Sequence, residues 1–189
     1  VHIVNNASLL QINALSSLYW IGTGLEINYN ASLENVGGLS GLSTLNSGPL
    51  NLIGNDSLLN LEGLSLTYIP DWLVIDNNLV LSSISSLDTI FDVGDYLQIS
   101  NNPQLGNLKG FSNLNSIGGY LEISNNDSLL EIDELSSLML VGGSVSISQN
   151  MYLMDLDGFY YLSSVGGYLS ITDNLFLEDI YGLSQLSSV

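Results

Sequence analysis

An asparagine recurs along this chain at nearly constant intervals, each time three residues after a short aliphatic-x-aliphatic segment. One copy reads Leu121-Glu122-Ile123 and is followed by Asn126. The intervals are 24, 25 and 23 residues and then 24 residues four times. The asparagines are Asn6, Asn30, Asn55, Asn78, Asn102, Asn126, Asn150 and Asn174. A repeat of about 20 to 50 residues is typical of solenoids, whose coils stack and bury one continuous core.

Between successive asparagines, apolar residues occupy about every third position. After Asn126 they are Leu129, Ile132, Leu135, Leu138 and Val141. This spacing fits neither the helical period of about 3.6 nor the strand period of about 2. It fits a coil of short straight segments and corners, in which only the aliphatic-x-aliphatic segment alternates as a strand does. The sequence therefore predicts one all-β domain over residues 1–189: a parallel β-helix or leucine-rich-repeat-like solenoid of seven to eight coils with little or no helix.

Two coils depart from the regular length. One residue is added between Asn30 and Asn55, and one is lost between Asn55 and Asn78. Each irregular coil contains a proline, Pro49 or Pro70, where other coils turn at glycine pairs such as Gly118-Gly119. Proline has no amide hydrogen for a sheet, so both prolines are expected at corners. The two changes cancel, which keeps the later coils in register.

Two longer phrases of the repeat, residues 114–123 and 162–171, resemble the receptor L-domain family. That family includes the ligand-binding L domains of insulin- and EGF-type receptors and related surface proteins of fungi and microbes. The resemblance implies a right-handed, leucine-rich-repeat-like β-helix, an extracellular or cell-surface location, and no catalytic residue. Family domains usually carry disulfides and end caps, whereas this chain has no cysteine and stops at Val189 in mid-repeat. We interpret it as a segment without end caps.

The charge balance argues against several classes of partner. Asp and Glu number 19, against the single cation Lys109, which gives a formal net charge of −18. Nucleic-acid binding requires clustered cations that neutralise phosphates, and an anionic membrane surface would repel this chain. No apolar run is long enough to predict a membrane span. The expected partner is a protein, with end-to-end self-association as one form and a glycan as another.

The repeated asparagines are predicted to form an internal ladder of side-chain hydrogen bonds. A buried amide is costly when unpaired, so its recurrence at one site of every coil indicates satisfied pairing. Four of these residues, Asn6, Asn30, Asn55 and Asn126, also begin N-glycosylation sequons. Because the ladder uses the same amides, we expect the sequons to be structural coincidences.

Aromatic residues often stand just before the strand segment. They are Trp72, Tyr96, Tyr120 and Tyr168, interrupted by Ser144. One interpretation is that the rings shield a corner of the core and stabilise neighbouring coils by stacking. The other is that they form a flat strip for a sugar or a partner surface, since Tyr and Trp favour interfaces. In the repeat around Asn126, this leaves Tyr120, Glu122 and Ser124 as residues free for function.

A second candidate contact follows the last two asparagines. Met151-Tyr152 and Leu175-Phe176 are apolar where earlier coils carry Ala31-Ser32 or Asp56-Ser57. Adjacent exposed apolar side chains favour a contact, either with further coils, another domain or another subunit.

No catalytic constellation is apparent in the sequence. The only histidine is His2, so a histidine-based triad or zinc site has no members. The acidic residues are scattered, and most are expected to form a solvated surface. Calcium is the only cofactor they suggest, and no calcium-loop motif supports it. We therefore expect a non-enzyme without a cofactor.

The expected function is that of an extracellular structural or adhesive solenoid, part of a larger surface protein or of an assembly. The alternative is a ligand-binding module that holds a glycan or a protein on its strand face or aromatic column. A third hypothesis, ice binding, rests on the repeated hydroxyls of Ser100, Ser124, Ser148 and Thr172.

Overall fold

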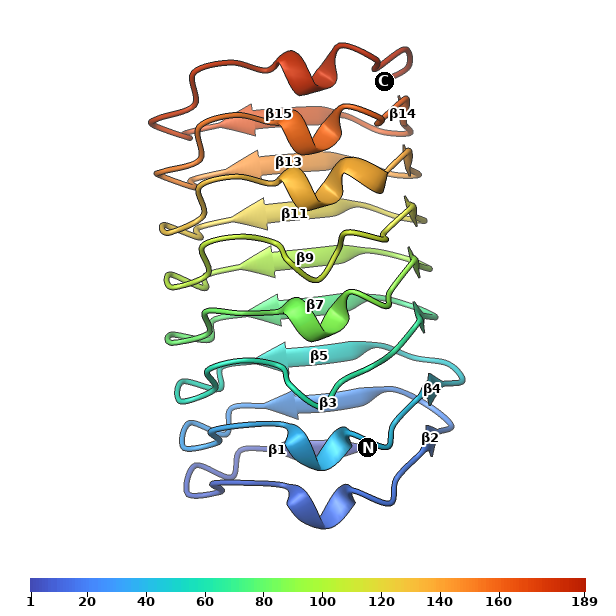
Figure 1. Ribbon diagram of the computed structural model, residues 1–189, viewed down its shortest axis with the longest axis vertical. Coiled ribbons are helices and arrows are strands. Elements are labelled where there is room, and N and C mark those ends of the chain that lie inside the picture. The colour runs from blue at the N-terminus through green and yellow to red at the C-terminus, as the bar shows by residue number, and fades with distance from the viewer.

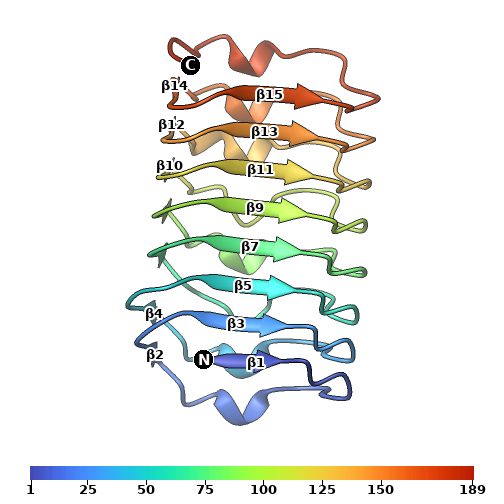
Figure 2. The same ribbon diagram turned by 180° about the vertical axis from the view of Figure 1, so that it is seen from behind.

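The computed structural model describes all residues, 1–189, as a stack of similar coils (Figure 1). Each coil contributes one strand to a parallel sheet that runs along the whole stack (Figure 2). Its strands are β1 (His2–Val4), β3 (Leu25–Asn28), β5 (Leu50–Ile53), β7 (Leu73–Asp76), β9 (Leu97–Ser100), β11 (Leu121–Ser124), β13 (Val145–Ser148) and β15 (Leu169–Thr172). We call this the main sheet. Equivalent residues pair, such as Leu121 with Leu97 and with Val145, as the repeat predicts.

Shorter strands form a second side of each coil. The strands β2 (Trp20–Ile21) and β4 (Thr44–Leu45) pair with each other. A separate five-stranded parallel sheet contains β6 (Tyr68–Ile69), β8 (Asp92–Val93), β10 (Ser116–Ile117), β12 (Leu140–Val141) and β14 (Ser164–Val165). Pro49 and Pro70 lie outside all strands, at the corners where they were predicted.

The third side of the coil carries single 3₁₀ turns and no α-helix. They are η1 (Asn13–Leu15), η2 (Gly37–Leu39), η3 (Ser85–Leu87), η4 (Asp133–Ser137), η5 (Asp157–Phe159) and η6 (Tyr181–Leu183). None of them has the length and hydrophobicity required to cross a bilayer. The prediction of an all-β parallel solenoid with about 24 residues per coil is confirmed.

The core is a single column of apolar side chains along the axis. It contains 44 buried residues, drawn from alternate positions of the main-sheet strands and from about every third position of the rest of the coil. Leu129, Ile132, Leu135, Leu138 and Val141 are all fully buried. Burial of this apolar surface is the main driving force for the fold, and the main sheet holds neighbouring coils in register. In the last coil, three apolar residues are only partly buried, because a neighbouring coil covers them on one side only. They are Leu169, Ile171 and Leu177.

The short-strand side is divided where the repeat length changes. Leu64 and Leu66 are separated by two positions, whereas the matching core residues of other coils are separated by three. The chain therefore reaches β6 with one residue fewer, and β6 does not pair with β4. The residue added earlier, near Gly48 and Pro49, realigns the main sheet, which is continuous.

The predicted asparagine ladder is present and nearly fully buried. The backbone N–H of Asn102 donates to Oδ1 of Asn126 over 3.1 Å, and Nδ2 of Asn102 donates to the carbonyl of Ile75 over 2.9 Å. The same pattern of donors links Asn6 through to Asn174. Every buried side-chain nitrogen and oxygen in the structure has a hydrogen-bond partner. The ladder thus satisfies the polar groups at one corner without interrupting the core.

The sequons coincide with this ladder. Asn30, Asn55 and Asn126 have no exposed surface, and each Nδ2 donates to a main-chain carbonyl. Glycan attachment would modify that same nitrogen, so these three residues are unsuitable acceptors in the folded chain. Asn6, in the first coil, is exposed.

The residue before each ladder asparagine has a left-handed backbone conformation. Most of these residues suit it: Asn5, Gly54, Asn77, Asn101, Asn125 and Asp173. Tyr29 and Gln149 are the exceptions, with φ of 58° and 56°. The repeated corner therefore contains two locally unfavourable residues, and Gln149 is exposed with no side-chain hydrogen bond to lose.

We predict that Gln149→Asn stabilises the fold. Asparagine tolerates the left-handed region better, so the free energy of unfolding should rise by about 0.5–1 kcal/mol, part of the roughly 1–2 kcal/mol that this conformation costs. Urea unfolding measures the change. Gln104→Asn is the matched control, because Gln104 is exposed and its φ is not positive. Equal effects at the two sites would contradict the explanation.

Candidate functional site

Three of the four predicted aromatic residues form one continuous stack on the main sheet. The rings of Trp72 and Tyr96 are parallel with centroids 5.5 Å apart, and those of Tyr96 and Tyr120 are 4.4 Å apart. Each residue immediately precedes its strand, so the register of the main sheet places the rings one coil apart. Tyr168 does not join this stack, because Ser144 takes the intervening position.

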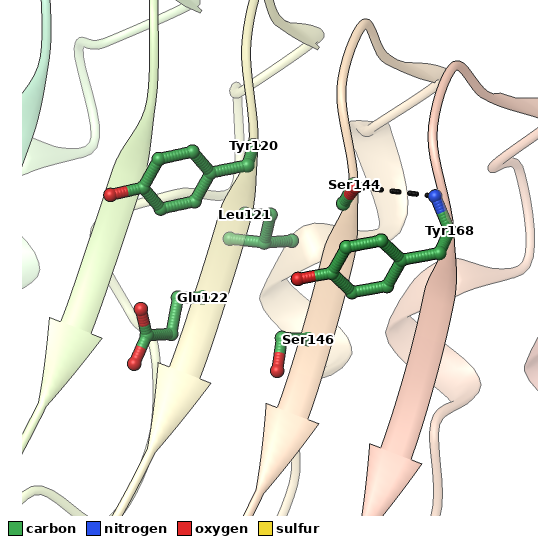
Figure 3. Close-up of a pocket in the computed structure, with 6 residues that line it drawn as sticks. All are labelled: Tyr120, Leu121, Glu122, Ser144, Ser146 and Tyr168. Atoms are coloured by element: carbon green, nitrogen blue, oxygen red, sulfur yellow. Dashed lines mark hydrogen bonds between the residues drawn. The ribbon is translucent and has the colours of Figure 1, made fainter.

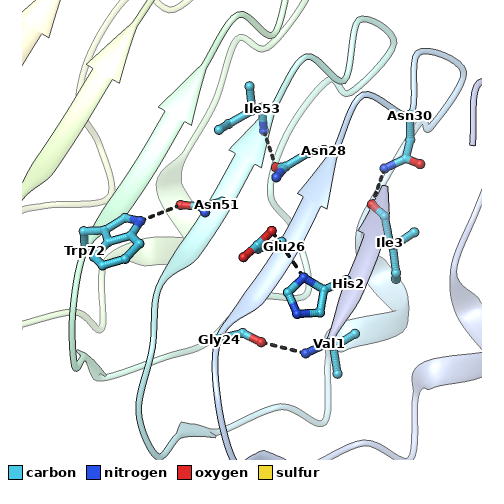
Figure 4. A network of polar contacts seen from close by, with 10 residues as sticks. All are labelled: Val1, His2, Ile3, Gly24, Glu26, Asn28, Asn30, Asn51, Ile53 and Trp72. Atoms are coloured by element: carbon cyan, nitrogen blue, oxygen red, sulfur yellow. Dashed lines mark hydrogen bonds and ion pairs between the residues drawn. The ribbon is translucent and has the colours of Figure 1, made fainter. Parts of the chain in front are cut away.

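The stack is anchored at its first ring. Nε1 of Trp72 donates to Oδ1 of Asn51 on the neighbouring strand β5, over 3.0 Å (Figure 4). The same face carries the only ion pair of the structure, between Nδ1 of His2 and Glu26 at 3.2 Å. His2 is largely exposed, so this pair contributes little to stability. The outer face of the main sheet therefore combines aromatic rings with polar side chains.

A depression lies at the interruption of the aromatic column. Its volume is about 350 Å³, near the lower limit for small-molecule sites. It is lined by Tyr120, Leu121, Glu122, Ser144, Ser146 and Tyr168 (Figure 3). Tyr120 and Tyr168, which immediately precede β11 and β15, extend in the same direction, and Ser144 lies between them just before β13. The Oγ of Ser144 accepts a hydrogen bond from the backbone N–H of Tyr168 over 3.2 Å.

Sequence reasoning named the two tyrosines and Glu122 but not the depression that they form with the serines. The sequence did hold an indication of the depression: Ser144 interrupts the aromatic column. The sequence also left Ser124 free for function, and this was wrong. Ser124 is 4% exposed, and its hydroxyl donates to Oε1 of Glu122 over 2.9 Å. Ser100 is 1% exposed, so the hydroxyl column proposed for ice binding is not a surface array.

The surroundings of the stack oppose ionisation of its tyrosines. Burial, followed by the neighbouring Tyr96, Glu122 and Asp95, raises the pKa of Tyr120 from 10.0 to about 12. Burial and then Asp95 also raise the pKa of Tyr96. The environment is thus unfavourable for a further negative charge.

We predict that Tyr120 ionises at a higher pH than a free tyrosine side chain. Because the folded chain favours the neutral phenol, the stability that this group contributes is complete below pH 10 and is lost as the pH rises towards about 12. Absorbance of tyrosinate during an alkaline titration measures the effect. Tyr120→Phe should remove one late-ionising group and flatten the decline in stability over that range. An alkaline titration unchanged by Tyr120→Phe at the high-pH end would contradict this.

The apolar residues predicted near the C-terminus form a second surface, which we call the corner patch. It contains Met151, Tyr152, Leu175 and Phe176 and follows the ends of β13 and β15. All four are exposed, Leu175 most at 71%, and the rings of Tyr152 and Phe176 stack at 5.3 Å. Leu79 and Val80 occupy the same corner of an earlier coil, a repetition that the sequence reasoning missed.

The acidic residues do not assemble a metal centre. No group of three or more His, Asp or Glu side chains is placed to hold an ion. The closest association surrounds Asp133, whose pKa is raised by burial and then by Glu131, Asp155 and Asp157. These carboxylates repel one another without converging on a common point, and the structure therefore gives the calcium hypothesis no site.

Comparisons of the chain with protein-family models, with curated proteins and with solved structures gave no match. The solenoid architecture therefore rests on the sequence repeat and the structure, and the candidate sites rest on their own geometry.

Proposed function

We propose that this chain is a non-enzymatic extracellular solenoid that acts as a structural or adhesive segment of a larger surface protein or assembly. The corner patch is the observation that carries this proposal. Exposed apolar side chains that stack on consecutive coils are costly to leave in water and favour a protein contact. The resemblance of residues 114–123 and 162–171 to receptor L domains supports the extracellular location.

The adhesive contact is proposed to form between copies of this chain. With one lysine against 19 acidic residues, ion pairs contribute little to a contact between two copies, and the corner patch offers an apolar one. Repulsion between the copies is screened beyond about 8 Å at physiological ionic strength. The ladder makes the stack a firm support for such a contact, because each coil is hydrogen-bonded to the next at the same corner.

Sedimentation velocity over a range of concentrations tests this function. We expect reversible association at physiological salt, weaker at low salt, and lost in the double variant Tyr152→Ser/Phe176→Ser. Tyr160→Ser/Tyr161→Ser is the matched control, since these two exposed tyrosines also contact each other but lie elsewhere in the coil. A chain that is monomeric at every concentration and salt would overturn the proposal.

The alternative function is a ligand-binding module for a glycan or a protein. The depression between Tyr120 and Tyr168 favours it, because it combines aromatic surface with a carboxylate and two hydroxyls. Binding there can be measured on dilute, monomeric protein, which separates it from adhesion through the corner patch.

A further inference from the structure

The aromatic column has a vacant position at Ser144. Trp72, Tyr96 and Tyr120 stack continuously, and Tyr168 resumes the column two strands after Tyr120. Neighbouring strands are about 4.8 Å apart, so residues two strands apart are separated by about twice that distance. This leaves space for one flat group beside the column, above Leu121 and next to Ser144.

The lining of this slot includes a carboxylate without a cationic partner. Glu122 is half-buried, and its Oε1 accepts a hydrogen bond from Ser124. The only ion pair of the chain is at His2, and Lys109 forms none. A partly desolvated carboxylate beside aromatic rings favours a cation that can pair with it and lie against the rings.

The remaining polar groups of the slot fit a donor-rich ligand. Glu122 can accept further hydrogen bonds at Oε2, and the hydroxyl oxygen of Ser146 makes no hydrogen bond within the chain. A guanidinium group is planar, carries only donors, and binds a carboxylate side-on while stacking on an aromatic ring. An ammonium group is compact and cannot fill a flat slot in this way.

We propose that the slot between Tyr120 and Tyr168 binds the guanidinium group of an arginine side chain from a partner protein. The group pairs with the Glu122 carboxylate and lies between the two tyrosines, completing the aromatic column over Ser144. The chain itself contains no arginine, so a second copy cannot supply the group. Its net charge of −18 also favours encounters with basic segments, more so at low salt.

This inference develops the ligand-binding alternative and is independent of the corner patch. The slot lies at the beginning of the main-sheet strands, and the corner patch follows their ends. Loss of self-association would therefore leave the slot intact, and loss of arginine binding would leave adhesion intact.

The test is a titration of the isotopically labelled, dilute chain with short glycine peptides whose ends are blocked. One peptide carries a central arginine, and matched peptides carry lysine or the neutral isostere citrulline. The arginine peptide should shift the NMR signals of Glu122, Ser146 and Tyr168. It should bind at least about tenfold more tightly than the citrulline peptide, since the ionic hydrogen bonds are lost in the latter.

Two variants locate the binding. Glu122→Gln should weaken arginine binding about tenfold, whereas Glu26→Gln, at the same strand position of another coil, should leave it unchanged. Ser144→Tyr should abolish binding by filling the slot, and it should maintain or raise the melting temperature by completing the stack.

Several results would overturn the proposal. Equal affinity for the arginine and citrulline peptides would remove the role of charge, and tighter binding of lysine would remove the role of planarity. Undiminished binding to Ser144→Tyr would place the ligand elsewhere. Absence of any shift at about millimolar peptide would exclude a functional site, and binding of a methyl glycoside alone would assign the slot to sugars.

Discussion

Asn126→Leu is expected to destabilise the solenoid by about 3–5 kcal/mol. Its Oδ1 accepts from the backbone N–H of Asn102, and its Nδ2 donates to the carbonyl of Ile99 and to Asn150. The substitution leaves the backbone N–H of Asn102 buried without its partner and removes the bond to the Ile99 carbonyl, whereas Oδ1 of Asn150 keeps the backbone N–H of residue 126. Each unpaired buried group costs about 1–3 kcal/mol, so the sum is a large part of the stability of an ordinary domain.

Urea unfolding followed by circular dichroism measures this loss. Asn115→Leu is the surface control, because Asn115 is exposed and makes no side-chain hydrogen bond, and it should change stability by less than about 0.5 kcal/mol. Asn6→Leu should be intermediate, because Asn6 is exposed and its Oδ1 accepts from no other coil. If all three variants unfolded alike, the ladder would not be an energetic element of the fold.

Gly142→Ala is the second substitution with a large expected effect. A Cβ at Gly142 would overlap the carbonyl oxygen of Gly118 in the preceding coil, and the same holds for Gly118 against Gly94. The overlap is with backbone, which cannot move without separating the coils. We expect a loss of about 3 kcal/mol or more, the upper range for overpacking a close contact.

The control for this prediction is another glycine of the same chain. At Gly106 the nearest atom to an added Cβ is the Ser128 carbonyl oxygen at 3.7 Å, an ordinary contact. Neither glycine has a positive φ, so Gly106→Ala should be neutral or stabilise by about 0.4–1 kcal/mol through the unfolded chain. Thermal unfolding of the two variants compares them directly. A mild effect of Gly142→Ala would show that the coils can separate at this corner.

The sequence predicts this fold well because each coil repeats the same physical requirements. The spacing of asparagines sets the register, and the apolar residues at every third position set the inward face. The interruption of the second sheet at β6 follows from the spacing of Leu64 and Leu66, but its position on a particular side of the coil requires the structure.

The candidate site is less predictable than the fold. The column position of Tyr120 and Tyr168 follows from the repeat, yet their ring directions depend on packing against neighbours. The repeat leaves Ser124 outside the core positions, yet it is nearly buried and its hydroxyl is bonded to Glu122, two residues earlier on the same strand. The conformation of a side chain cannot be read from the spacing of the repeat. This explains why the sequence identified the residues but not the depression that they line.

The asparagine ladder also gives the solenoid a direction. In every step the donor is the backbone N–H of the earlier coil and the acceptor is Oδ1 of the later one. The first coil therefore has an Oδ1 on Asn6 that accepts from no other coil, and the last has a backbone N–H on Asn174 that donates to none. Two stacks could continue the ladder only head to tail, because joining like ends would set acceptor against acceptor or donor against donor. Any assembly that extends through this corner is consequently polar, with all of its coils running the same way.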